Sequence, residues 1–381
     1  MVGGRGAGVP TMTRRGLLTG AGALITAEEG VGRYAAITGW GMAVPRRLMT
    51  NHDLAALVET SDEWIRSRTG IGSRYVAGEG ETSATLGTQA ARAALAQAGL
   101  AADQLDLIIC ATCTPDHPAM PATACLIQHA LGAGRAAAFD LSAACTGFVY
   151  GLAAGSQFIA GGLYRRVLVV GADTLTRTLD WTDRRTCVLF GDGAGAVVLE
   201  ASEAPAGLLG VELGADGGGG PLLCVPAGGG RQPLNAAVLG TSAQYLQMNG
   251  REVYKFGVRI MVEATLGAVR KAGLALADID LLVPHQANSR IIESATAQLG
   301  IPAARVMLNV ERYGNTSAAS IPIALCEAAA TGRLQPGDHA VVVGMGGGLT
   351  WGAGVLLWTS SPLERRNGYA LASERPALVA E

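Results

Sequence analysis

The chain has 381 residues, a formal net charge of −2, 49% hydrophobic residues and 16% charged residues. This composition allows a large buried core and excludes an intrinsically disordered chain. The near-neutral charge argues against a nucleic-acid-binding protein or a membrane-surface protein, so a basic patch for an acidic partner would have to be local.

The N-terminal residues 1–32 allow two interpretations. Arg14 and Arg15 precede a short apolar stretch, residues 16–25, which is typical of a twin-arginine export signal. The alternative is a flexible extension, or translation from a start codon upstream of the true one. Elsewhere no segment reaches the run of about 20 apolar residues that a membrane span needs.

The seven cysteines are scattered and odd in number, which argues against a disulfide framework and for a reducing compartment. Cys110 and Cys113 form a C-x-x-C pair, but no second pair or nearby histidines complete a zinc set. We therefore expect both to be buried cysteines at the end of the apolar strand that contains 107–109, and we predict no metal site.

Two parts of the chain resemble each other. Residues 98–109 read AGLAADQLDLII and residues 272–283 read AGLALADIDLLV. Each follows an alanine-rich stretch that predicts a helix, Ser83–Gln97 in the first case and Glu252–Lys271 in the second. Each also ends in an apolar run that predicts a strand.

Two further matches keep the same order along the chain. Val167–Gly171 corresponds to Val341–Gly344, and Gly193–Leu199 corresponds to Gly352–Trp358. The order predicts a duplicated β/α unit. Continuous apolar strands are typical of sheets that are buried on both faces, so the expected architecture is layered α/β, with helices between and outside two sheets.

This duplication sets the expected boundaries. We expect a first half over 33–205 and a second half over 206–361, with tails at 1–32 and 362–381. Residues 206–245 are rich in glycine and proline, which predicts a loop-rich connection between the two halves.

Cys145 lies where an apolar strand gives way to small residues and then to a helix expected from about Thr146 to Gly161. A thiol at a helix N-terminus faces free amide groups and the positive end of the helix dipole, which predicts a lowered pKa and a reactive thiolate. A buried structural cysteine is an equally good interpretation of this position alone.

His285 and Asn315 stand at comparable places in the second half. His285 follows the strand that repeats residues 105–109, and Asn315 falls near the strand end that corresponds to Cys145. Each is explained alone by a structural role, as a hydrogen-bonded histidine or a turn residue. A pseudo-twofold relation between the halves would, however, bring all three side chains towards one point.

Glycines 346–348 follow the strand 340–344. Successive glycines can present backbone amides to a ligand, and together with the amide of Cys145 they would form an oxyanion hole; a plain turn is the alternative. The segment 191–195 does not fit G-x-G-x-x-G and no Walker A motif is present, so nucleotide-phosphate binding is poorly supported.

Together these segments resemble the β-ketoacyl-acyl-carrier-protein synthase III family over residues 33–360. The motifs that carry the resemblance occur in order: TSDEWIRSRTGI (60–71), DLSAACTGF (140–148), FGDGAGA (190–196), PHQANSRII (284–292), YGNTSAAS (313–320) and GGGLTWG (346–352). The resemblance implies a thiolase fold in five layers (α-β-α-β-α), a homodimer, and a cytoplasmic enzyme that starts fatty-acid synthesis. Cytoplasmic substrates favour a flexible extension over an export signal for 1–32.

The resemblance also implies a mechanism. Cys145 would take an acyl group from acyl-CoA, and malonyl-acyl-carrier protein would then lose carbon dioxide and attack that group. His285 and Asn315 would bind the thioester oxygen of the enolate, while the amides of Cys145 and Gly347 would hold the other oxyanion. No cofactor is implied, since coenzyme A and the carrier's phosphopantetheine belong to the substrates.

The remaining site residues follow from the same resemblance. The family's coenzyme A contacts correspond to Trp64, Arg68, Arg184, Tyr254 and Asn288. Arg290, Lys255 and Arg251 would form the basic patch for the carrier protein, whereas a solvated surface charge is an adequate interpretation of Arg259.

This chain departs from the family at Met120, where a phenylalanine often crosses the dimer interface and limits the acyl length. Arg251 and Tyr254 also replace the usual asparagine and phenylalanine, so the primer is left open. A biosynthetic thiolase would need a second cysteine where Met345 stands, and an elongating synthase would carry histidine at Asn315. A starter synthase of a specialised pathway and an inactive carrier-binding scaffold remain as alternatives.

Overall fold

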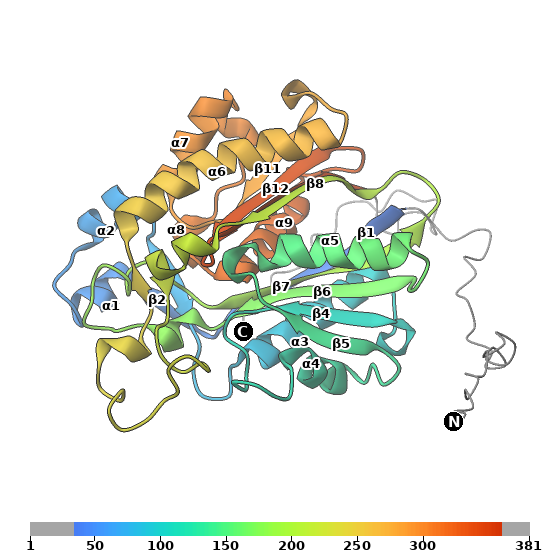
Figure 1. Cartoon of the computed structure of the whole chain (residues 1–381). Coiled ribbons are helices and arrows are strands. Elements are labelled where there is room, and N and C mark those ends of the chain that lie inside the picture. Colours follow the sequence, from blue (N-terminus) through green and yellow to red (C-terminus); the bar gives the residue numbers. More distant parts are fainter. Residues whose placement is uncertain (1–33, 360–381) are drawn as a thin grey trace, which may run out of the picture.

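Two sheets alternate with three layers of helices in this computed structural model, which describes residues 34–359 (Figure 1). From one outer face to the other, the order is helix, sheet, helix, sheet, helix, as the sequence predicted. The predicted tails 1–32 and 362–381, with the paired arginines, lie outside the described residues. None of the described helices combines the length and hydropathy of a membrane-spanning segment.

The first sheet has the order β5-β4-β6-β7-β1. Its strands β4, β5 and β6 are parallel, and β7 runs antiparallel between β6 and β1. The strands are β1 (Tyr34–Ala43), β4 (Leu107–Ala111), β5 (Ala137–Leu141), β6 (Arg166–Asp173) and β7 (Gly193–Ser202).

The second sheet repeats this arrangement with the order β11-β12-β13-β8. The strands are β8 (Gly207–Ala215), β11 (Leu281–Pro284), β12 (His339–Gly346) and β13 (Thr350–Leu357). A parallel bridge from Leu282 to Val306 takes the place that β5 has beside β4. One parallel contact, Ala35 with Gly207, joins the two sheets into a continuous order of nine strands.

The duplication predicted from the sequence is therefore confirmed, since β4, β6 and β7 correspond to β11, β12 and β13. The prediction of a loop-rich connection over 206–245 was wrong at its start, where β8 forms the edge of the second sheet. Gly210 explains the error. A Cβ atom at this residue would lie 2.5 Å from the amide nitrogen of Ala272, so glycine here allows a helix to approach the strand rather than forming a turn.

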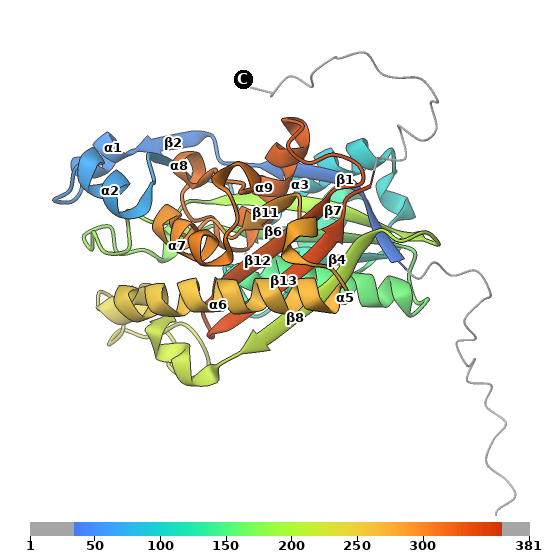
Figure 2. The same cartoon turned by 90° about the horizontal axis from the view of Figure 1, so that it is seen from above.

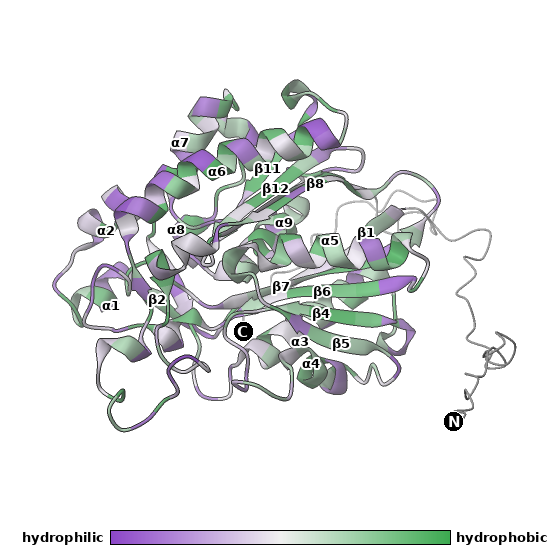
Figure 3. Ribbon diagram, viewed as in Figure 1, coloured by the Kyte–Doolittle hydropathy of each residue, from purple (hydrophilic) through white to green (hydrophobic). Residues whose placement is uncertain are grey.

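Each helical layer packs on its own apolar cluster. Helices α3 and α4 cover the outer face of the first sheet, α6 and α7 cover the outer face of the second, and α5 and α9 fill the space between the sheets (Figures 1 and 2). The helices are α3 (Ser83–Ala98), α4 (Thr123–Leu131), α5 (Gly147–Ala160), α6 (Gly250–Lys271), α7 (Ser289–Leu299) and α9 (Ser320–Ala330). The strands are mostly apolar, and the outer helices have mixed polar and apolar faces (Figure 3).

Short elements gather at one end of the layered core, where α1, α2, β2 and α8 lie together (Figures 1 and 2). They are β2 (Arg47–Thr50), α1 (Asn51–Ala55), α2 (Asp62–Thr69), β3 (Ser73–Val76) and α8 (Val310–Tyr313). A separate apolar cluster that includes Leu54, Ile65, Val188 and Val310 packs them together. This end carries the candidate site.

Candidate active site

Cys145 lies in a 3-10 turn, Ala144–Thr146, between the end of β5 and the start of α5. Ala144 has a φ of +47°, a left-handed conformation that costs a residue with a Cβ atom about 1–3 kcal/mol. The turn also lies against Gly346, because a Cβ atom there would come within 2.7 Å of the Cys145 nitrogen. The surrounding backbone therefore fixes the position of the thiol.

The second half has the same turn ahead of α9, at Ser317–Ala319, and the two turns contact each other. Ser317 repeats the left-handed conformation of Ala144, with a φ of +53°. Gly171 in β6 allows the close approach, since a Cβ atom there would lie 2.2 Å from the carbonyl oxygen of Ala318. The two halves thus meet at the backbone around the cysteine.

Asp173 ties the two halves together beside these turns. Its buried carboxylate accepts hydrogen bonds from the hydroxyl of Thr112, the amide of Cys113, and both the amide and the hydroxyl of Thr114, at 2.8–3.1 Å. The other carboxylate oxygen accepts the amide of Ala318 from the second half at 3.2 Å. A buried carboxylate with so many donors is well satisfied and holds the loop after β4 against the second turn.

The side chains of Cys145, His285 and Asn315 line one cavity of about 420 Å³. The cavity is otherwise apolar around these groups and opens past residues expected to bind coenzyme A or the carrier protein. Those expected residues that line it are Trp64, Arg68, Arg184, Tyr254, Asn288 and Arg290.

Burial dominates the protonation of the thiol. It raises the pKa of Cys145 to about 12, and hydrogen bonds from the Ser317 hydroxyl and from its own backbone amide only partly oppose the shift. The lowered pKa expected from the helix N-terminus is therefore wrong. The reason is that the turn places the sulfur away from water, where a negative charge loses its hydration.

His285 is buried at the end of β11, and burial lowers its pKa to about 3, so the imidazole is neutral near pH 7. Its Nδ1 lies 2.5 Å from the hydroxyl oxygen of Ser320, the first residue of α9. The side-chain oxygen of Asn315 accepts the backbone amide of Ser317 at 2.9 Å. This bond leaves the NH₂ end of Asn315 as the end that can donate to a ligand.

A second cavity of about 270 Å³ also borders Cys145, and Gly347, Leu175 and Phe190 line it as well. Cys113 lines it as well, with its sulfur 3.7 Å from the hydroxyl oxygen of Ser317. The expectation that Cys113 is buried is wrong, because the chain leaves the sheet after Ala111 and exposes this residue; Cys110 within β4 is buried as expected.

Trp64 stands at the mouth of the larger cavity, close to two guanidinium groups. The Arg68 and Arg184 guanidiniums lie 4.7 Å and 5.0 Å from the centre of the indole ring. Asn288 connects this region to α7, since its oxygen accepts the amide of Arg290 at 2.9 Å and its nitrogen donates to the carbonyl of Arg68 at 3.1 Å. One hydrogen of the Asn288 amide group remains for a ligand.

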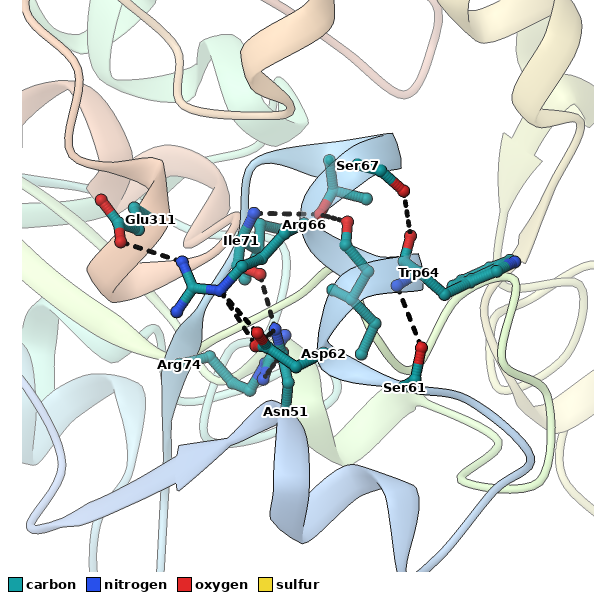
Figure 4. Close-up of polar contacts among 11 residues, drawn as sticks. Asn51, Ser61, Asp62, Trp64, Arg66, Ser67, Ile71, Arg74 and Glu311 are labelled. Atoms are coloured by element: carbon teal, nitrogen blue, oxygen red, sulfur yellow. Dashed lines mark hydrogen bonds and ion pairs between the residues drawn. The ribbon is translucent and has the colours of Figure 1, made fainter.

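A network of polar contacts holds α2, the helix that carries Trp64 (Figure 4). Asn51 donates to Asp62 at 2.8 Å and accepts from the buried Arg74 at 2.8 Å. Arg66 binds Asp62 at 2.9 Å and reaches Glu311 of α8 at 2.9 Å. Burial lowers the pKa of Arg74 to about 10, so it stays charged at neutral pH. The network joins the mouth of the cavity to the segment that leads to Asn315.

The other expected residues lie outside the larger cavity. Arg251 and Lys255 are exposed on α6 near its mouth, and Lys255 pairs with Glu252 at 2.8 Å. Met120 is 81% exposed and lines neither cavity within this chain. Over residues 34–359 no group of three or more histidine, cysteine or carboxylate side chains is arranged to hold a metal ion.

Asp173, Ser317 and Ser320 orient the site, and none of them was predicted as a site residue. Both serines fall within the YGNTSAAS motif, but nothing in the sequence pairs Ser320 with a histidine 35 residues away. A buried cysteine beside a neutral imidazole and an amide, between the halves of a duplicated five-layer scaffold, defines the class of thiolase-fold enzymes that condense acyl thioesters.

Comparison with known proteins identifies the family. Two family models, for 3-oxoacyl-[acyl-carrier-protein (ACP)] synthase III and for its C terminal part, match residues 139–217 and 269–358. A β-ketoacyl-[acyl-carrier-protein] synthase III from a Roseiflexus species is 57% identical over 327 residues, which cover 86% of this chain and 99% of that protein.

Solved structures agree. The 3-oxoacyl-[acyl-carrier-protein] synthase III of Aquifex aeolicus is 46% identical, with a TM-score of 0.79 over 85% of this chain and 100% of that one. The priming β-ketosynthase of a polyketide biosynthetic pathway is 35% identical, with a TM-score of 0.80 over 86% and 97% of the two chains. The chain belongs to the β-ketoacyl-acyl-carrier-protein synthase III family, has its thiolase fold, and is an acyltransferase.

The raised pKa of Cys145 predicts how the thiol reacts with an alkylating agent. Because only the thiolate reacts, the rate of Cys145 carbamidomethylation by iodoacetamide should rise about tenfold per pH unit from pH 7 to pH 10 without a plateau. Peptide mass spectrometry separates this site from the other thiols, with Cys145→Ala as control. A plateau below pH 9 would contradict the raised pKa.

Proposed function

We propose that this chain condenses an acyl-CoA primer with malonyl-acyl-carrier protein to give 3-oxoacyl-acyl-carrier protein, coenzyme A and carbon dioxide, and so starts fatty-acid synthesis. The observation that carries the proposal is the shared cavity, which Cys145, His285 and Asn315 line and whose mouth holds Trp64 close to two arginines. The family to which the chain belongs supports the same reaction.

In the first step the sulfur of Cys145 loses its proton and bonds to the acyl carbon, the bond from that carbon to the sulfur of coenzyme A breaks, and the departing thiolate takes up the proton that Cys145 released. The amides of Cys145 and Gly347 hold the negative oxygen of the tetrahedral intermediate. The close contact between Gly346 and the Cys145 turn supports this oxyanion-binding role, because it leaves no side chain between the two backbone segments.

In the second step malonyl-acyl-carrier protein replaces coenzyme A, and the bond to its carboxylate breaks to release carbon dioxide. The electron pair forms an enolate whose carbon attacks the acyl group, and Cys145 leaves as the thiolate. His285 and Asn315 donate hydrogen bonds to the enolate oxygen. A neutral imidazole suits this task, since the charge it must stabilise arises only in the transition state.

Trp64, Arg68 and Arg184 bind the adenine end of coenzyme A, while Tyr254 and Asn288 lie along the path of the pantetheine arm. Arg290, Lys255 and Arg251 attract the acidic carrier protein through exposed charges near the cavity mouth, which mainly speeds its association. The reaction needs no metal or resident cofactor, because coenzyme A and phosphopantetheine arrive with the substrates. These substrates, together with free cysteines throughout the described chain, favour a cytoplasmic enzyme.

A homodimer completes the acyl site in this proposal. Strand β5 ends the sheet order and is only partly buried, so its free edge is available to a second copy. The exposed Met120 of one subunit would then close the smaller cavity of the other. The flexible thioether of methionine accepts longer or branched primers more readily than a rigid ring does.

The acylation step separates the proposed enzyme from an inactive carrier-binding scaffold. With a short acyl-CoA and no malonyl-acyl-carrier protein, intact-mass spectrometry should show one acyl adduct on the wild-type chain and none on Cys145→Ala. His285→Ala should still acquire the adduct but release carbon dioxide at least about a hundredfold more slowly. Absence of the wild-type adduct would refute the enzyme assignment, and undiminished carbon dioxide release would refute the role of His285.

The gate residue gives a separate prediction about the primer. Met120→Phe should reduce acylation by the longest or most branched acyl-CoA accepted, at least about tenfold, and leave acetyl-CoA within about twofold. Leu163→Phe, a change at another exposed apolar residue, is the control. Because the gate is proposed to form between two subunits, light scattering should give a molar mass twice that of one chain. An unchanged primer profile, or a monomer at assay concentration, would contradict the dimeric gate.

Acylation with a panel of different acyl-CoA primers also distinguishes fatty-acid initiation from a specialised pathway. The alternative is a starter synthase that primes a specialised acyl chain, and the likeness to the priming β-ketosynthase, at 35% identity, supports it. Preference for acetyl or short branched primers supports fatty-acid initiation, whereas exclusive use of an unusual primer supports the specialised pathway.

A further inference from the structure

The hydroxyl group of Ser320 is placed to select one tautomer of His285. Its oxygen lies 2.5 Å from Nδ1, and both side chains are buried. The two residues come from different elements, since His285 follows β11 and Ser320 begins α9. The backbone amide of Gln286 also points to the hydroxyl oxygen, at 3.4 Å.

The direction of the hydrogen bond between Ser320 and His285 follows from the acceptors that each possible donor would need. If Nδ1 carried the proton and donated it, the hydroxyl proton of Ser320 would need an acceptor elsewhere. Within residues 34–359, Nδ1 is the one acceptor that bonds to this hydroxyl. An unsatisfied buried donor is costly enough to disfavour that arrangement by about fivefold or more. The hydroxyl therefore donates to Nδ1.

We propose that Ser320 is a positioning residue that holds His285 as the tautomer with its proton on Nε2. With Nδ1 engaged by Ser320, the Nε2 edge is the one left to serve the cavity that His285 lines. An N–H at this edge is the donor that the decarboxylation step requires, and this part of the inference rests on the proposed function. The opposite tautomer would present a lone pair to the enolate oxygen and repel it.

A hydroxyl group also suits this buried position beside His285. A hydroxyl group adds no charge, so the imidazole stays neutral, whereas a carboxylate in place of Ser320 would favour the imidazolium. The fixed start of α9 and the end of β11 hold the two groups together without a flexible loop.

The tautomer of the wild-type protein provides a test that does not depend on activity. Solid-state ¹⁵N NMR of protein labelled at histidine, with His285→Ala subtracted, should show a protonated Nε2 and a bare Nδ1 for His285. A protonated Nδ1 would overturn the proposal. This spectrum remains decisive if Cys145 proves not to acylate, in which case the proposed function fails while the tautomer assignment stands or falls separately.

Kinetics of Ser320 variants test the consequence. Ser320→Ala should slow carbon dioxide release at least about tenfold and leave Cys145 acylation within about twofold, and Ser320→Thr, which keeps the hydroxyl, should restore most of the rate. Ser156→Ala is the matched control, because this buried hydroxyl in α5 has no hydrogen-bond partner among residues 34–359. Equal loss of both half-reactions, or full decarboxylation by Ser320→Ala, would overturn the role. Should that variant not fold, the wild-type spectrum decides.

Discussion

The candidate site depends on the close approach of two backbone turns, one from each half of the duplicated scaffold. Gly171 and Gly346 permit it, since a Cβ atom at either would collide with Ala318 or with Cys145. Asp173 then bonds to both sides of the contact. Cys145 from one half and His285 and Asn315 from the other share a cavity because only backbone separates the halves at this contact.

Burial has opposite effects on the two ionisable groups, and both keep the site neutral. It raises the pKa of Cys145 to about 12 and lowers that of His285 to about 3. The resting cavity therefore holds a thiol and an imidazole rather than an ion pair. Charge arises only during the proposed reaction, where fixed amides and neutral donors meet it, so the stabilisation acts on the transition state more than on the ground state.

Much of the architecture could be predicted from the sequence because duplication leaves repeated apolar strands and alanine-rich helices in the same order. The helix predicted at Ser83–Gln97 ends one residue later, at Ala98, and that predicted at Glu252–Lys271 begins two residues earlier, at Gly250. Strand β8 was missed because glycines within it, such as Gly210 against α6 and Gly214 against Trp351, allow close packing and do not form turns. Local pattern cannot distinguish these two uses of glycine.

The residues of the candidate site were predictable from sequence motifs, whereas the contacts that orient them were not. The motifs indicated Cys145, His285 and Asn315, and the fold brings these residues to one cavity. The bonds from Ser317 and Ser320 depend on how two distant turns are oriented, which no local spacing records. The protonation of Cys145 was mispredicted for the same reason, since the effect of burial depends on the whole tertiary structure.

The central claim is that His285 and Asn315 act on one thioester oxygen beside Cys145. It is tested most directly by a crystal structure of the protein with a malonyl thioester analogue whose carboxylate is replaced by a sulfonate, so that decarboxylation cannot occur. Our account predicts that Nε2 of His285 and Nδ2 of Asn315 both lie within about 3.2 Å of the thioester oxygen. An analogue bound with that oxygen away from either nitrogen, or outside the shared cavity, would contradict it.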